Sequence, residues 1–178
     1  MLDNLITTRG FTLIELLVTM TVAAILLAVA IPSYQTFVLN NRMSSQSNDL
    51  LSAFQLARSE AIKRSIRVSI CKGTGGVCVA GGTWAQGWMV FVDDDGVVGT
   101  RDGTDQPIQV YPALTGATAL GATANASNFI SYLPAGMTNL AIGTTATFTL
   151  CPGVPGVNGR NIQVVASGRA SIVNTACP

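Results

Sequence analysis

The feature that most constrains this chain is a predominantly apolar run from Phe11 to Ile31, in which Glu15 is the single charged residue. As a helix, at about 1.5 Å per residue, this run spans about 31 Å, which matches the hydrocarbon core of a bilayer. A carboxylate in hydrocarbon costs at least ~2.5–3.5 kcal/mol on the mildest scale. We therefore predict a transmembrane helix over residues 11–31, in which the Glu15 carboxylate pairs with another group and has a functional role.

A cleaved secretory signal peptide is the alternative interpretation of the same run. Ala28-Val29-Ala30 supplies a small-residue cleavage site of the required type. The residues before the run, however, carry Arg9 as their single positive charge and also contain Asp3. The run is also long for a signal peptide and contains Glu15, so a retained segment is favoured.

The composition excludes several classes of function. The chain has 178 residues and a net charge of +1, so no global field directs it to nucleic acid. It contains no histidine, and a Ser/His/Asp or Cys/His catalytic arrangement therefore cannot be built. We predict that the protein is not an enzyme and uses no cofactor.

A second, amphipathic helical segment is predicted over residues 32–66. Pro32 either ends the first helix at the membrane surface or bends a helix that continues, and continuation is favoured. Residues 40–48 are polar all round and predict a weak or solvated part of this helix. A single apolar stripe then follows, formed by Leu50, Phe54, Ala57 and Ala61.

Residues 67–178 predict a β-rich domain. Alternating or continuous apolar patterns mark five strands, at residues 67–71, 88–92, 147–151, 161–166 and 169–173. The run at 88–92 predicts a strand buried on both faces, and Ser167-Gly168 predicts a two-residue hairpin turn. Residues 113–146 predict loop with weak or edge strands. The fold class is thus α+β, with a long N-terminal helix packed on a β-rich head.

The residues around the start of the apolar run resemble a known processing signal. Thr8-Arg9-Gly10 precedes Phe11-Thr12-Leu13-Ile14-Glu15, which is similar to the type III signal of type IV pilins and type II secretion pseudopilins. The resemblance implies a leader over residues 1–10, cleavage after Gly10 by a prepilin peptidase, and N-methylation of Phe11. It also implies an inner-membrane subunit with a periplasmic head, which enters a filament after processing.

In that setting Glu15 has a physical partner. The new α-amino group of Phe11 on a neighbouring subunit can neutralise the carboxylate within the same apolar layer. Such a pair offsets its desolvation only if its geometry is good, so it favours one axial stagger between helices. We interpret Glu15 as a register device for assembly with other major and minor pilins.

The head also resembles one particular family. Leu56–Ile62 leading to Val68–Cys71, then Gly87–Phe91 and Ser167-Gly168-Arg169, look like the FimT/GspH family of minor pilins and H-type minor pseudopilins. The favoured function is a minor pilin that initiates or caps a type IV pilus. The alternatives are a DNA-binding minor pilin for natural transformation and the minor pseudopilin H of type II secretion.

Four cysteines allow three disulfide pairings or a thiolate zinc site. We favour Cys71–Cys78 and Cys151–Cys177, because each pair closes a loop within one segment. The spacings are not a usual zinc pattern. Disulfides would place the head in an oxidising compartment, and paired cysteines are more like FimT and FimU minor pilins than pseudopilins.

Two further groups of residues are candidate binding sites. Arg160, Arg169 and Lys72 could neutralise a few phosphates of DNA, but Ser171 stands where DNA-binding relatives carry a second arginine. Asp93-Asp94-Asp95-Gly96, with Asp102 and Asp105, could offer carboxylates to calcium. EF-hand spacing is absent and aspartate and glycine also suit turns, so no metal site is predicted.

Overall fold

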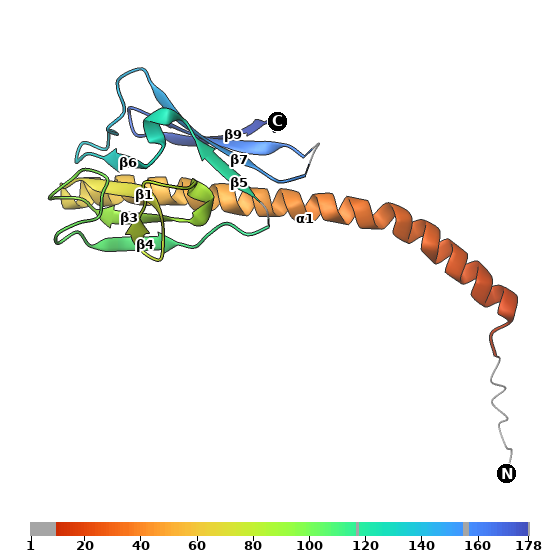
Figure 1. Ribbon diagram of the computed structural model, residues 1–178. Coiled ribbons are helices and arrows are strands. Elements are labelled where there is room, and N and C mark those ends of the chain that lie inside the picture. Colours follow the sequence, from red (N-terminus) through yellow and green to blue (C-terminus); the bar gives the residue numbers. More distant parts are fainter. Residues whose placement is uncertain (1–9, 117, 155–156, 178) are drawn as a thin grey trace, which may run out of the picture. The chain divides into compact units, whose positions relative to one another are not determined.

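A computed structural model describes residues 10–116, 118–154 and 157–177 (Figure 1). Residues 1–9 of the predicted leader therefore lie outside the described residues. The chain divides into two compact units, residues 1–38 and residues 39–178. One helix, α1 (Leu13–Arg64), begins in the first unit and ends in the second.

The described part of the first unit consists of residues 10–12 and the apolar half of α1. The helix contains Pro32 in its interior, so the helix does not end there. From Phe11 to Phe37 every side chain is exposed, including all the large apolar ones. This part of α1 is long and apolar enough to cross a membrane, with a mean hydropathy of 2.5 over its best 18-residue window.

The second unit is the head, in which the rest of α1 packs on two antiparallel sheets (Figure 1). The first sheet has the order β2-β1-β3-β4, with β6 also paired to β1. Its strands are β1 (Val68–Thr74), β2 (Val77–Cys78), β3 (Trp88–Val92), β4 (Pro107–Tyr111) and β6 (Phe129–Tyr132). The second sheet has the order β5-β7-β8-β9. Its strands are β5 (Ala119–Ala122), β7 (Thr145–Cys151), β8 (Gly159–Val165) and β9 (Ala170–Thr175).

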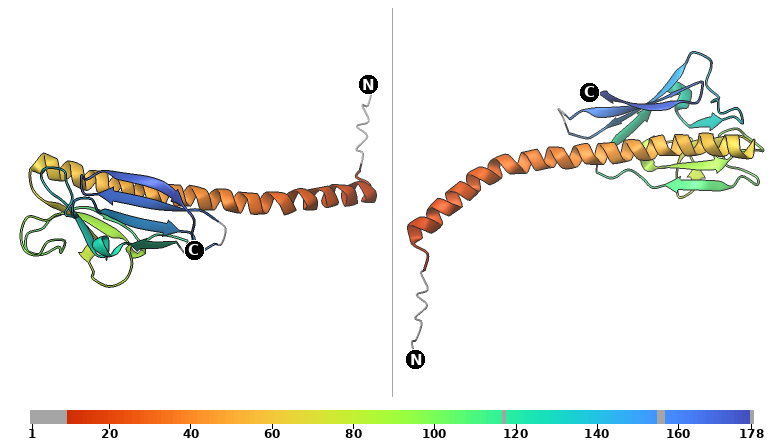
Figure 2. Two further views of the ribbon diagram at one scale, coloured as in Figure 1. Left: turned by 90° about the horizontal axis from the view of Figure 1, so that it is seen from above. Right: turned by 180° about the vertical axis from the view of Figure 1, so that it is seen from behind.

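One hydrophobic core joins the helix to both sheets, which Figure 2 shows on either side of the C-terminal half of α1. Phe54 of the helix lies 5.1 Å from Phe148 of β7, measured between ring centroids. Trp84, in a short 3-10 turn before β3, meets Phe148 edge to face at 5.0 Å and donates its indole N–H to the carbonyl of Ala126. This aromatic cluster holds helix and second sheet together, and it contributes more than burial alone because its ring geometry is favourable. The α+β prediction is confirmed.

The helical stripe predicted from the sequence faces this core. Leu50, Phe54, Ala57 and Ala61 are each at most 1% exposed. The expectation that residues 40–48 are solvated is wrong, because Met43, Gln46 and Ser47 are also buried. Their donor groups have partners: Ser47 donates to the carbonyl of Ser44, and the side-chain amide of Gln46 donates to the carbonyl of Thr115 at 3.1 Å. The Oε1 atom of Gln46 has no partner among the described residues.

The strand predicted to be buried on both faces is β3. Val90 faces the main core, whereas Met89 and Phe91 join Cys71 in a second cluster on the other face of the sheet. β3 lies between β1 and β4, so neither its edges nor its faces reach water. This explains why its sequence is continuously apolar.

Residues 113–146 contain two short edge strands, as expected: β5 borders the second sheet and β6 borders the first. β6 is nevertheless well buried, with Ile130 and Tyr132 at 0% exposure. β4 was missed, because it is an edge strand that opens on Pro107 and contains no buried residue. Its pattern therefore carries little of the alternation that marks a half-buried strand.

The predicted hairpin between β8 and β9 is present, but its turn has three residues rather than two. Val165 donates to the carbonyl of Arg169, which leaves Ala166, Ser167 and Gly168 in the loop. Gly168 has a φ of +82°, the left-handed conformation that closes three-residue hairpins. The left-handed conformation of Gly168 gives the loop its three residues, and the dipeptide Ser167-Gly168 alone does not specify this loop length.

Candidate assembly site and the polar clusters of the head

The N-terminus of α1 is formed by a capping arrangement around Thr12. The Thr12 carbonyl accepts the first helical hydrogen bond, from the N–H of Leu16 at 3.1 Å. The Thr12 hydroxyl accepts the N–H of Glu15 at 3.3 Å. Thr12-Leu13-Ile14-Glu15 thus has the spacing of a capping box, a signal that was present in the sequence and was not used. It places Glu15 in the first turn, where the helix dipole favours a negative charge.

Three other threonines of the apolar half form hydrogen bonds within the helix itself. Thr19 donates to the carbonyl of Leu16, and Thr21 donates to the carbonyls of Leu17 and Val18. Thr36 donates to the carbonyl of Pro32 at 3.2 Å. Such back-bonded hydroxyls suit an apolar medium, because no donor is left without an acceptor. In residues 11–38 Glu15 is the one charged side chain, and its carboxylate has no hydrogen bond or ion pair within the described part of the chain.

The head is fastened by two disulfides. Cys71 bonds to Cys78 and Cys151 bonds to Cys177, the pairing favoured from the sequence, with Cα–Cα distances of 5.6 and 5.8 Å. The first joins β1 to β2 across a hairpin, and the second ties the C-terminal segment after β9 to the end of β7. All four thiols are therefore used, and the zinc alternative is excluded.

The residues considered for DNA binding do not form one patch. Lys72 is 5% exposed and donates its ammonium to the carbonyl of Gly82, so this ammonium is not free on the surface for a phosphate. Arg160 lies at the start of β8 and is half-buried, whereas Arg169 is exposed at the other end of the hairpin, opposite Val165. Five residues of strand separate the two positions, which is about 16 Å.

Asp93, the first residue of the aspartate cluster, is part of a buried network. Its carboxylate accepts hydrogen bonds from the hydroxyl of Ser69, the N–H of Gly99 and the guanidinium of Arg67, the last at 3.2 Å. Ser69 also contacts the hydroxyl of Ser131 at 2.6 Å. Asp93 has 0% exposure and is fully engaged, so it links β1, β3 and β6 instead of offering oxygens to a cation.

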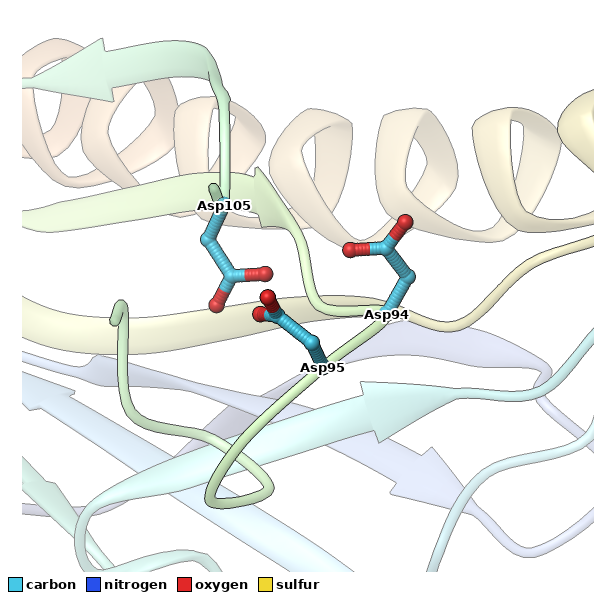
Figure 3. A group of neighbouring side chains, drawn as sticks. All are labelled: Asp94, Asp95 and Asp105. Atoms are coloured by element: carbon cyan, nitrogen blue, oxygen red, sulfur yellow. The ribbon is translucent and has the colours of Figure 1, made fainter. Parts of the chain in front are cut away.

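Three other aspartates of the same loop converge. One carboxylate oxygen from each of Asp94, Asp95 and Asp105 lies within 4.8 Å of the corresponding oxygens of the other two (Figure 3). Asp94 and Asp95 are exposed and follow β3, while Asp105 is buried and precedes β4. Burial raises the pKa of Asp105, and the nearby carboxylates of Asp93 and Asp95 raise it further, whereas the backbone N–H groups of Asp102 and Asp94 lower it. Sequence reasoning noted the cluster but could not see which members meet.

The fold and the N-terminal helix together define a class of protein. An exposed, membrane-length apolar helix continues into a disulfide-linked head of two antiparallel sheets, and a lone carboxylate lies in its first turn. This is the architecture of a pilin-like subunit, in which the helix serves for anchoring and assembly.

Comparisons with known proteins give the family. Residues 46–168 match the family described as type II transport protein GspH, and residues 7–31 match the prokaryotic N-terminal methylation motif. The chain belongs to the GspH family, whose members are pilin and pseudopilin subunits rather than enzymes. The resemblance noted from the sequence is therefore confirmed, and the methylation motif marks the chain as a prepilin peptidase substrate.

Two solved structures have a similar fold. Both are crystal forms of the type IV minor pilin FimU from Pseudomonas aeruginosa strain PAO1. The first has a TM-score of 0.59 and 19% sequence identity, over 77% of this chain and 92% of that chain. The second has a TM-score of 0.55 and 18% identity, over 73% and 91%. No curated protein matches the chain in sequence.

Proposed function

We propose that this protein is a minor pilin that initiates or caps a type IV pilus. In this proposal prepilin peptidase cleaves the chain after Gly10, and the amino group of Phe11 is methylated. The chain then stands in the inner membrane with its head in the periplasm. Its apolar helix leaves the bilayer by packing against the helices of other pilins.

The observation that carries the proposal is the exposed apolar half of α1 with Glu15 in its first turn. None of the residues of its best membrane-spanning window is buried within the chain. A helix that is apolar all round needs lipid or other helices as its surroundings. In this proposal lipid surrounds the helix before assembly, and the helices of other pilins surround it in the filament. The carboxylate of Glu15 then pairs with the α-amino group of Phe11 on a neighbour. That ammonium sits at the positive end of its own helix dipole, so a carboxylate beside it is favourable.

A type II secretion pseudopilin is the second candidate, favoured by the description of the matching family as a transport protein. Two observations support the pilus instead. The head contains two disulfides, a feature more typical of FimT and FimU minor pilins, and its fold resembles that of FimU. DNA uptake has less support, because Lys72 is buried and the two arginines lie at opposite ends of a hairpin.

Deletion of the gene in the source organism tests the proposal. We expect surface pili, measured by immunoblot of sheared filaments, to fall at least about tenfold, because filament initiation is a nucleated step. Secretion of exoproteins in the same cultures should be unchanged. Normal pili with lost secretion would instead identify a pseudopilin.

Mass spectrometry of the complementing protein tests the processing step. We expect a mature chain that begins at Phe11 and carries one methyl group. The variant Gly10→Val should keep its leader and fail to restore pili, because a branched side chain replaces the small residue at the cut. A chain that restores pili with its leader uncleaved would contradict the proposed processing.

A further inference from the structure

We propose that the loop between β3 and β4 binds one calcium ion through Asp94, Asp95 and Asp105. The loop joins Val92 to Pro107 in the first sheet of the head. Asp94 and Asp95 lie at its beginning and Asp105 at its end. A cation held by all three would clip the two ends of the loop together.

The geometry of the three carboxylates fits this ion. Two oxygens bound to one Ca²⁺ at about 2.4 Å lie at most about 4.8 Å apart. One carboxylate oxygen of each of the three aspartates lies within 4.8 Å of the other two, a spacing compatible with one ion between them after small side-chain adjustments. Figure 3 shows the carboxylates of Asp105 and Asp95 pointing toward each other, with that of Asp94 beside them.

A second observation points to a ligand at this place. Asp105 is only 5% exposed, yet its Oδ1 has no hydrogen-bond partner, while its other oxygen accepts the N–H of Asp102 at 3.2 Å. A buried carboxylate oxygen without a partner is unfavourable when charged, because nothing replaces the water that it loses on burial. Its side chain is aimed at the carboxylates of Asp94 and Asp95, which can offer it no proton donor. A cation between them would satisfy the oxygen directly.

The local charge is otherwise uncompensated. Among the described residues, no ion pair involves Asp94, Asp95, Asp102 or Asp105. The nearest cation in sequence, Arg101, donates to the carbonyls of Asp105 and Gly76 rather than to a carboxylate. The proposed calcium site does not use Asp93, because the Asp93 carboxylate already accepts hydrogen bonds from Arg67, Ser69 and Gly99.

Calcium suits the site better than magnesium. Mg²⁺ needs near-ideal octahedral ligands at about 2.0–2.1 Å and retains several waters, whereas Ca²⁺ accepts irregular sets of carboxylates and water. With three protein carboxylates, two of them exposed, the expected affinity is that of extracellular calcium modules, with a Kd of about 10⁻⁴–10⁻³ M. The inference rests on the proposed periplasmic or surface location only for the supply of calcium.

Calorimetric titration of the full chain in non-ionic detergent, after treatment with chelator, tests the site. We expect one Ca²⁺ per chain, a rise in the melting temperature of the head, and at least about tenfold weaker binding of Mg²⁺ at the same ionic strength. The double variant Asp94→Asn/Asp95→Asn changes two exposed side chains and should weaken calcium binding at least about tenfold. Asp49→Asn, which removes an exposed carboxylate of α1, should bind calcium as the unmodified chain does.

Asp105→Asn separates a ligand from a structural residue. In chelator this variant should be at least as stable as the unmodified chain, because it removes a charge that faces other carboxylates, yet its calcium-dependent rise in melting temperature should disappear. Absence of saturable binding to the unmodified chain at several millimolar calcium would overturn the proposal. So would equal binding of Mg²⁺, or unchanged calcium affinity in the Asp94→Asn/Asp95→Asn variant. These measurements use purified protein, so their failure is distinct from failure of the proposed function in cells.

Discussion

At the scale of single residues, Gly168 shows how a backbone contact restricts a side chain. It closes the β8–β9 hairpin with a φ of +82°. A Cβ at this position would overlap the carbonyl oxygen of Gly136 and lie 3.3 Å from Nε of Arg58. The hairpin loop therefore contacts both the loop after β6 and the helix, and any side chain at residue 168 would separate them.

Gly168→Ala should accordingly destabilise the head by about 3 kcal/mol or more, the sum of left-handed backbone strain and a clash with main chain. Gly143→Ala is the matched control. Gly143 has nearly the same φ, +84°, but open space around its Cβ, so only the strain of about 1 kcal/mol should appear. Chemical denaturation of the full chain in detergent measures both. Equal losses would show that the contact with Gly136 is unimportant.

At the scale of elements, the two disulfides fasten different parts of the head. Cys71–Cys78 closes a loop with a sequence separation of 7, within the β1–β2 hairpin. Cys151–Cys177 closes a separation of 26 and holds the chain after β9 against the end of β7. Loop-closure entropy grows with the length of the closed loop, so the two bonds should differ in their effect on stability.

Removing Cys151–Cys177 should lower the free energy of unfolding by about 3.5 kcal/mol, and removing Cys71–Cys78 by about 2.4 kcal/mol, in the chain-entropy account. Alanine is the suitable replacement, because Cys71 is buried and a serine hydroxyl there would need a partner. Denaturant titration of the two double alanine variants tests the order. A larger loss for the short loop would show that packing around Cys71, rather than loop entropy, dominates.

At the scale of the whole molecule, one helix has two kinds of surroundings. The described side chains from Phe11 to Phe37 are exposed within the chain, whereas from Met43 onward one face of α1 is buried in the head. The first half is thus stable only in lipid or against other helices. Glu15 is its one charged side chain, so the charge balance of the assembled filament depends on it.

Glu15→Gln and Glu15→Ala should both fail to enter filaments, with incorporation reduced at least about tenfold, because each loses the charge that pairs with the amino group of a neighbour. Glutamine can still complete the capping box with Thr12. Rescue by glutamine alone would therefore show that Glu15 acts as a helix cap and not as an intermolecular partner. Thr19→Val, which removes a hydroxyl bonded within the helix, should incorporate normally. Immunoblots of sheared pili provide the measurement.

Much of this architecture could be predicted because its signals are local and periodic. Three patterns of apolar residues predict which surface is buried: the N-terminal apolar run, the continuous run of β3, and the stripe formed by Leu50, Phe54, Ala57 and Ala61. β4 was missed because an exposed edge strand carries no such pattern. Residues 40–48 were misjudged because the hydrogen bond of Gln46 to Thr115 joins residues far apart in sequence.

The environments of the polar residues in the head were the hardest property to predict, because they depend on tertiary structure. Lys72, Asp93 and Asp105 look like surface charges in the sequence, yet each is at most 5% exposed. Their partners come from other strands and loops, and only the folded chain brings those groups together. The capping box at Thr12 and Glu15, by contrast, was visible in four consecutive residues.

The sequence by itself thus determined the membrane-length helix, the processing motif and the α+β class, because hydrophobic length, spacing and periodicity are properties of neighbouring residues. Only the tertiary structure decided which aspartate is structural and which three converge, and how far apart the two arginines lie. Those properties depend on strand order and register, through which residues distant along the chain become neighbours in space.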